Sequence, residues 1–138
     1  MGTAAMIGIY NENGTVTASY CHYDGYLEGV GATLLKSYNS QYDASYVSHG
    51  GYVSSLDDDY LVSRQQAVHE EPAISYTNVS TYLERGSAFS GADYLYLWDG
   101  DCWYFAPTNT GVSVGFEEVR INLKQNEKNG VLLWQDQN

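Results

Sequence analysis

The chain has 138 residues, 43% of them hydrophobic, which suits one globular domain rather than a disordered segment. Its 17 acidic and 6 basic residues give a formal net charge of −11; because a surface of that sign repels nucleic-acid phosphates, we expect no direct DNA or RNA binding. The sequence also lacks an apolar run of about 20 residues, which predicts no membrane span.

The start of the chain lacks the basic region and the long apolar stretch of a secretory signal. We expect residues 1–5 to be a disordered tail or a remnant of cloning, with Met6 as the natural start and residues 6–138 as a single α+β domain. Two cysteines, Cys21 and Cys102, are too few for a disulfide framework and form no CxxC pair. This predicts a reducing compartment and no structural zinc site.

The first 40 residues predict a β-hairpin followed by a helix. Residues 7–10 suit a short strand, and the Asn13-Gly14 dipeptide favours a type I′ turn. Residues 15–20 return as the partner strand because they are rich in β-branched side chains. Apolar residues then recur at helical spacing, which predicts a helix over about residues 29–40.

The second half of the chain predicts another helix and another hairpin. Residues 73–76 suit a strand, and Thr77 or Asn78 is a suitable N-cap for a helix that we expect to end near Gly86. The strongest strand prediction covers residues 93–98, where aromatic and aliphatic side chains are dense.

An Asp-Gly-Asp turn follows that strand, and residues 102–105 complete an aromatic hairpin. Residues 116–123 fit a helix or a strand, of which we favour the helix, and residues 131–134 can add an edge strand. Together these elements predict an α+β fold: an antiparallel sheet built from two β-hairpins, with two or three helices packed on one face.

Fourteen tyrosines are an unusually large number for this length. A tyrosine offers a flat apolar face and a hydroxyl, which suit stacking on a base or forming a subunit interface. Strand alternation accounts for Tyr94 and Tyr96 as one face of a strand. Tyr20, Tyr23 and Tyr26 lie at the turn into the first helix, where a ligand or partner site and ordinary surface tyrosines both stay open as interpretations.

The histidine at this turn has two candidate partners. Adjacent strand residues point to opposite faces, so Cys21 and His22 are not expected to form a catalytic dyad. His22 and Asp24 share a face, and the carboxylate can orient the imidazole ring. A weak hydrolase alternative depends on this pair, beside a purely structural histidine. We therefore assign no catalytic residue and no cofactor.

Other polar residues give one further candidate. His49, His69 and the acidic run 57–59 match no known metal-binding spacing, so we predict no metal site. Arginine is scarce, and an anionic ligand would need one; Arg85, beside Gly86, is the preferred phosphate contact, with a surface ion pair as the alternative. The predicted ligand site comprises Tyr20, His22, Tyr23, Asp24, Tyr26 and Arg85.

The string over residues 20–26, Tyr-Cys-His-Tyr-Asp-Gly-Tyr, is followed by Gly-Val-Gly at 29–31, and together they resemble a family of small, uncharacterised bacteriophage proteins. In that family the string tends to read Tyr-Cys-His-Trp-Asp-Gly-Tyr, usually with a proline next; here Tyr23 replaces the tryptophan and Leu27 the proline. The resemblance covers most of residues 6–105. The further matching elements are residues 51–56, residues 94–103 and Arg85-Gly86.

This resemblance implies a phage gene product that acts in the cytoplasm of the infected bacterial host. The leading hypothesis is a non-enzymatic, homo-oligomeric protein that sequesters a nucleotide-type host immune signal in a pocket lined by tyrosines and arginine. The alternative is an acidic decoy that inhibits a basic host defence protein, such as a CRISPR effector or a nuclease. Gathering of five carboxylates on one face would favour that alternative: Asp57, Asp58, Asp59, Glu70 and Glu71.

Overall fold

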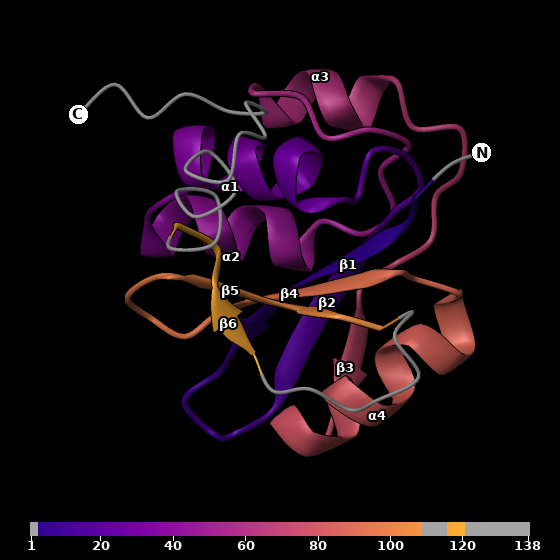
Figure 1. The fold of residues 1–138 in the computed structure, drawn as a ribbon. Coiled ribbons are helices and arrows are strands. Elements are labelled where there is room, and N and C mark those ends of the chain that lie inside the picture. Colours follow the sequence, from indigo (N-terminus) through magenta and orange to yellow (C-terminus); the bar gives the residue numbers. More distant parts are fainter. Residues whose placement is uncertain (1–2, 109–115, 121–138) are drawn as a thin grey trace, which may run out of the picture.

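The structure, a computed structural model, describes residues 3–108 and 116–120, with the backbone alone for residues 87–90. It is an α+β fold in which a six-stranded sheet lies between helices (Figure 1). The strand expected over residues 131–134 lies outside the described residues.

Six strands form the sheet in the order β3-β2-β1-β4-β5-β6. They are β1 (Ala5–Tyr10), β2 (Val16–Cys21), β3 (Ile74–Tyr76), β4 (Tyr94–Trp98), β5 (Trp103–Pro107) and β6 (Glu117–Glu118). Both predicted hairpins are present, as the antiparallel pairs β1–β2 and β4–β5. The first turn is longer than a type I′ turn, because pairing ends at Tyr10↔Val16. β6 occupies two residues of the segment 116–123 for which a helix is favoured; Val119 and Arg120 are helical, and residues 121–123 lie outside the described residues.

The two hairpins meet through a parallel pair, which corrects the expectation of a purely antiparallel sheet. β1 lies parallel to β4, from Ala5↔Tyr94 to Ile9↔Trp98, while the other pairs are antiparallel. A parallel pair needs a long crossover connection, and the chain between β2 and β4 supplies one that contains the helices. Both central strands are buried along nearly their whole length, as a strand covered on both faces must be.

Five helical segments are described: the π-helical turn η1 (Leu27–Gly31), α1 (Ala32–Ser37), α2 (Gln41–His49), α3 (Tyr60–Gln65) and α4 (Val79–Ser90). The helix predicted over residues 29–40 is thus divided, and α2 begins after Ser40, whose side chain accepts a hydrogen bond from the Asp43 amide at 3.1 Å. Among the described residues, no helix has both the length and the apolarity needed to cross a bilayer.

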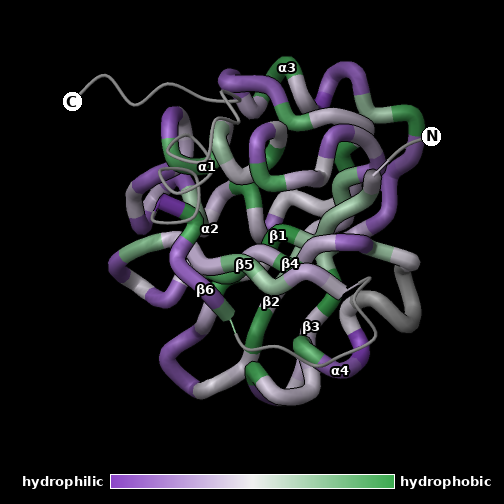
Figure 2. The backbone as a smooth tube through the Cα atoms, viewed as in Figure 1, coloured by the Kyte–Doolittle hydropathy of each residue, from purple (hydrophilic) through white to green (hydrophobic). Residues whose placement is uncertain are grey.

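Helices cover both faces of the sheet, rather than the one face expected. Strand alternation sends Ala5, Ile7 and Ile9 into a core beneath η1, α1 and α2, whereas Met6 belongs to a second core beneath α4. Figure 1 shows α1, α2 and α3 on one side of the sheet and α4 on the other. Figure 2 shows hydrophobic residues concentrated along the central strands, which accounts for the need to cover both faces.

Glycine lets α4 lie close to the sheet. A Cβ at Gly86 would lie 2.7 Å from Cδ2 of Leu95, so α4 rests on β4 at this residue and continues past it, where the sequence predicted an end. The fully buried Tyr82 ring lies against Gly8, and its hydroxyl donates a hydrogen bond of 2.8 Å to the Tyr96 carbonyl.

Residues 3–5, which the sequence assigns to a tail, belong to the fold. Ala5 begins β1 and is fully buried, and the Ala4 carbonyl accepts a hydrogen bond of 2.9 Å from the Asp93 amide. The Thr3 carbonyl accepts another, of 2.7 Å, from the Gly25 amide. These contacts tie the beginning of the chain to the turn that follows β2.

Candidate functional site

The motif over residues 20–26 and 29–31 forms the turn from β2 into η1. Asp24 adopts a left-handed conformation, with φ of 58°, and its carbonyl accepts a hydrogen bond of 2.9 Å from the Val30 amide. A Cβ at Gly29 would overlap this same carbonyl oxygen, and a Cβ at Gly25 would lie 2.7 Å from the Ala4 carbonyl carbon. The glycines are thus required by close backbone approach, so their presence needs no ligand to explain it.

Cys21 and His22 point to opposite sides of the chain, as alternation along a strand requires. The Cys21 side chain is fully buried, and burial raises the pKa of its thiol to about 12. The His22 side chain is exposed. A thiol with that pKa stays protonated at neutral pH, which is unfavourable for a nucleophile.

Aromatic rings gather beside this turn in what we call the corner cluster: Tyr20, His22, Tyr23, Tyr52 and His69. Tyr20 stacks on Tyr52 with ring centroids 5.8 Å apart, and its hydroxyl lies 3.1 Å from Nδ1 of His22. In the His22–Tyr23 pair, the edge of one ring meets the face of the other, and the ring centroids are 4.5 Å apart. The structure therefore brings together three of the six predicted site residues.

Two other predicted residues form a separate pair. The Tyr26 hydroxyl donates a hydrogen bond of 3.4 Å to Oδ1 of Asp24, and this carboxylate is the main cause of a raised Tyr26 pKa. His22 takes Tyr20 as its partner, while Asp24 takes Tyr26. The hydrolase alternative needs His22 paired with Asp24, but the described hydrogen bonds of these two residues go to different tyrosines.

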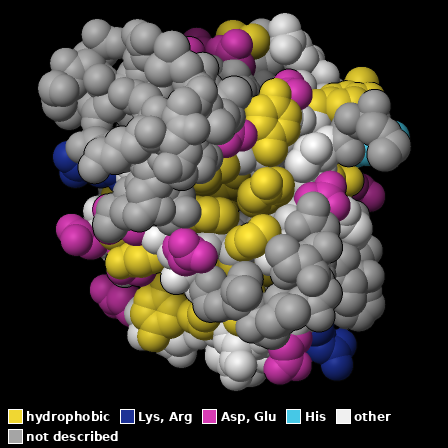
Figure 3. Space-filling view, in the orientation of Figure 1, with side chains coloured by type: hydrophobic (Ala, Val, Ile, Leu, Met, Phe, Trp, Pro, Cys, Tyr) yellow, Lys and Arg dark blue, Asp and Glu magenta, His cyan; other side chains and the backbone are white. Residues whose placement is uncertain are grey.

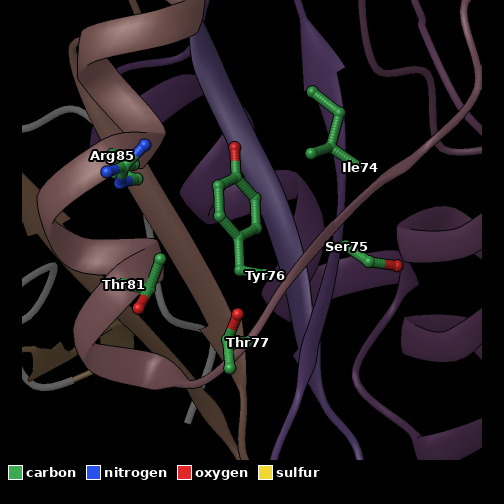
Figure 4. A pocket seen from close by; sticks show the side chains of 6 residues that line it. All are labelled: Ile74, Ser75, Tyr76, Thr77, Thr81 and Arg85. Carbon is green, nitrogen blue, oxygen red and sulfur yellow. The ribbon is translucent and has the colours of Figure 1, made fainter.

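Arg85 lines a cavity of about 640 Å³ between β3 and α4, which we call the edge cavity (Figure 4). Its lining comprises Ile74, Ser75, Tyr76, Thr77, Thr81 and Arg85. Thr81 and Arg85 lie four residues apart on α4 and so share one face of that helix, whereas Thr77 lies in the bend between β3 and α4. The volume lies within the usual range for small-molecule sites, roughly 300–1,000 Å³.

β3 supplies the other wall of the edge cavity. Ile74 and Tyr76 pair with Ala18 and Val16, which belong to the core beneath α4. The Ser75 side chain points away on the opposite side of the strand in Figure 4. The cavity therefore presents apolar surface from β3 and polar groups from the α4 segment.

The Tyr76 hydroxyl is the most telling group in the edge cavity. The side chain is only 6% exposed, and its oxygen has no hydrogen-bond partner within the described part of the chain. Burial raises the pKa of this hydroxyl, so it stays a neutral donor and acceptor. Leaving such a group unpaired costs about 1–3 kcal/mol, which a ligand atom bonded to it would offset.

The predicted site is thus divided between two places. Arg85 lines the edge cavity, whereas Tyr20, His22, Tyr23, Asp24 and Tyr26 do not. Sequence reasoning missed Tyr76 and the two threonines, although the four-residue spacing of Thr81 and Arg85 within α4 was a usable signal.

Tyr52 and His69 were missed for a different reason. Tyr52 reaches the corner cluster through the long-range pairing of Val53 with Cys21, and His69 through the segment whose Glu71 carbonyl accepts a hydrogen bond of 2.8 Å from the Tyr52 amide. No local pattern encodes either contact. A contact of this kind becomes visible only once the chain is folded.

The described residues contain no group of three or more His, Cys, Asp or Glu side chains that could hold a metal ion. Nδ1 of His49 lies 2.9 Å from the Ser45 carbonyl, and His69 meets the Tyr52 ring.

Comparison of the chain with models of known families, with curated proteins and with solved structures finds no match.

Proposed function

We propose that this chain is a binding protein for a small anionic ligand of nucleotide type, which it holds in the edge cavity without chemical turnover. The observation that carries this proposal is a cavity lined by both Arg85 and Tyr76, whose buried hydroxyl has no hydrogen-bond partner among the described residues. A guanidinium and hydroxyl groups are suited to phosphate oxygens, because charge-assisted hydrogen bonds are the strong ones.

The two walls of the cavity give the ligand an orientation. Phosphate oxygens would contact Arg85 and the Thr81 hydroxyl, while a base or sugar would pack on Ile74 and hydrogen-bond the Tyr76 hydroxyl. This division follows the polar α4 side and the apolar β3 side of the edge cavity. The resemblance to phage proteins supports the wider proposal that the ligand is a host immune signal which the protein sequesters.

The charge of the whole protein favours a small ligand over a polyanion. With a net charge of −11, the molecule repels an extended phosphate backbone, whereas one phosphate group can be held by a local cation. On the face shown in Figure 3, acidic side chains appear among hydrophobic ones, and Lys and Arg appear only near the margin.

The acidic decoy stands second because part of its charge has a structural use. Asp58 pairs with Lys36 at 3.3 Å and accepts a hydrogen bond of 2.7 Å from the Ser37 hydroxyl. The Asp59 side chain caps α3 by accepting a hydrogen bond from the Leu61 amide at 3.0 Å. Folding of α1 and α3 thus accounts for two of the five carboxylates on which that alternative depends.

Isothermal titration tests ligand binding directly. The purified chain is titrated with AMP, cyclic dinucleotides and cyclic ADP-ribose isomers, and we expect saturable heat with at least one of them. Arg85→Gln should weaken that binding by about tenfold or more, because it removes a charged hydrogen-bond donor. Arg120→Gln removes the same charge from an exposed residue outside the cavity lining and should leave the affinity unchanged. Absence of heat with every compound, or an equal loss in both variants, would contradict the proposal.

A further inference from the structure

A second hollow, of about 370 Å³, lies where α2 meets the start of α3. Its lining includes the aromatic rings of Tyr42, Tyr46 and Tyr60 together with the carboxylates of Asp43 and Asp59. We call it the α2–α3 cleft. None of these residues lines the edge cavity, so the cleft is independent of the proposed ligand site.

The rings of the cleft are inclined to one another, and two of them, Tyr42 and Tyr46, are open to solvent, whereas Tyr60 is buried. Tyr42 and Tyr46 lie one helical turn apart on α2, with ring centroids 6.0 Å apart and an interplanar angle of 61°. The ring centroids of Tyr46 and Tyr60 are 4.9 Å apart, and the two ring planes are inclined by 42°. Tyr42 is 74% exposed and Tyr46 is 47% exposed, so neither ring is placed there by the core. The faces of such rings attract a cation within about 6 Å.

The carboxylates of the cleft are held by local hydrogen bonds. Oδ2 of Asp43 accepts a bond of 2.9 Å from the Ser40 hydroxyl, and Oδ1 of Asp59 accepts one from the Leu61 amide. An ionised carboxylate can accept several donors, so both can bind a further N–H group. The protein places one of its own cations at this cleft, because Lys36 pairs there with Asp58.

We propose that the α2–α3 cleft receives an arginine side chain of a basic protein partner. The planar guanidinium would stack on the faces of Tyr42 and Tyr46, while Asp43 and Asp59 accept its N–H groups. The net charge of −11 complements such a partner and steers it toward the protein. The cleft would then provide the specific contact that a diffuse negative charge lacks.

Titration with an acetylated hexa-arginine amide, at low and at near-physiological salt, tests this site on the full chain. We expect Tyr42→Leu to weaken binding by about two- to five-fold, the effect of one exposed cation–π contact. Tyr42→Phe, which keeps the ring, should bind as the wild type does. Asp43→Asn should weaken binding more than Glu12→Gln, although each removes one charge, because Glu12 lies in the turn between β1 and β2.

The outcomes separate a cleft from a general charge effect. If Tyr42→Leu binds the peptide like the wild type, or if Asp43→Asn and Glu12→Gln have equal effects, the proposal is overturned. Sedimentation provides the remaining check: self-association that Tyr42→Leu abolishes would make a second copy of the chain the occupant instead. Because Tyr42 is largely exposed, its variants should unfold at the wild-type temperature, which thermal unfolding verifies.

Discussion

Two buried tyrosines on the α4 face differ in how their hydroxyls are used. The Tyr82 hydroxyl donates to the Tyr96 carbonyl at 2.8 Å, whereas the Tyr76 hydroxyl has no partner among the described residues. Tyr82→Phe should therefore lower the free energy of unfolding by about 1 kcal/mol. Tyr76→Phe should leave it unchanged or raise it slightly. Urea unfolding measures both, and a larger loss in Tyr76→Phe would mean that its hydroxyl is bonded in solution.

Single residues of the candidate site were only partly predictable. The scarcity of arginine drew attention to Arg85. The concentration of aromatic residues at the end of β2 and in the turn after it drew attention to Tyr20 and Tyr23. The prediction, however, placed these residues in one site, while the fold sends Arg85 to a cavity beside β3. The Tyr76 hydroxyl stands out because it has no hydrogen-bond partner among the described residues. No sequence pattern reports a missing hydrogen bond.

The turn between β2 and η1 allows a matched test of two glycines from the same motif. A Cβ at Gly29 would overlap the backbone of Asp24, so Gly29→Ala should destabilise the protein by about 1–3 kcal/mol. A Cβ at Gly31 would meet only side-chain atoms, at 3.0 Å from Leu27 and 3.4 Å from Tyr96. Gly31→Ala also gains helix propensity, so its effect should be much smaller. Chemical denaturation gives both values, and similar losses would contradict this account of the motif.

Elements with strong local patterns were predicted, and those set by distant contacts were not. Residues 93–98 carry an unmistakable strand pattern and form β4, and both hairpins are confirmed. The parallel pairing of β1 with β4 joins residues almost 90 positions apart (Ala5↔Tyr94), which periodicity cannot report. The regular spacing over residues 29–40 likewise did not report that α1 ends at Ser37.

The whole molecule should lose stability in alkali. Burial raises the pKa of Tyr38 and of Cys21 to about 12, and raises those of Tyr82 and Tyr96 well above the ordinary 10.0. The unfolded chain releases these protons at lower pH than the folded chain does. The stabilisation is therefore complete below about pH 9 and is lost progressively toward about pH 12.

Urea unfolding at a series of pH values measures this loss. Tyr42→Phe serves as the matched control, because it removes a hydroxyl from a side chain that is 74% exposed. Tyr38→Phe should make the decline shallower, since it removes one of the groups that titrate. A free energy of unfolding that stays constant up to about pH 11 would contradict this prediction.

Within the described residues, the sheet ends on each side in a very short strand: β3 has three residues, and β6 has two, both glutamates. Such borders offer few unpaired backbone groups to a neighbouring molecule, and at β6 two copies would bring like charges together. A homo-oligomer, which the tyrosine content led us to expect, is therefore not expected to assemble by pairing of β3 or β6. Neither of these edge strands favours a continuous β-sheet shared between subunits.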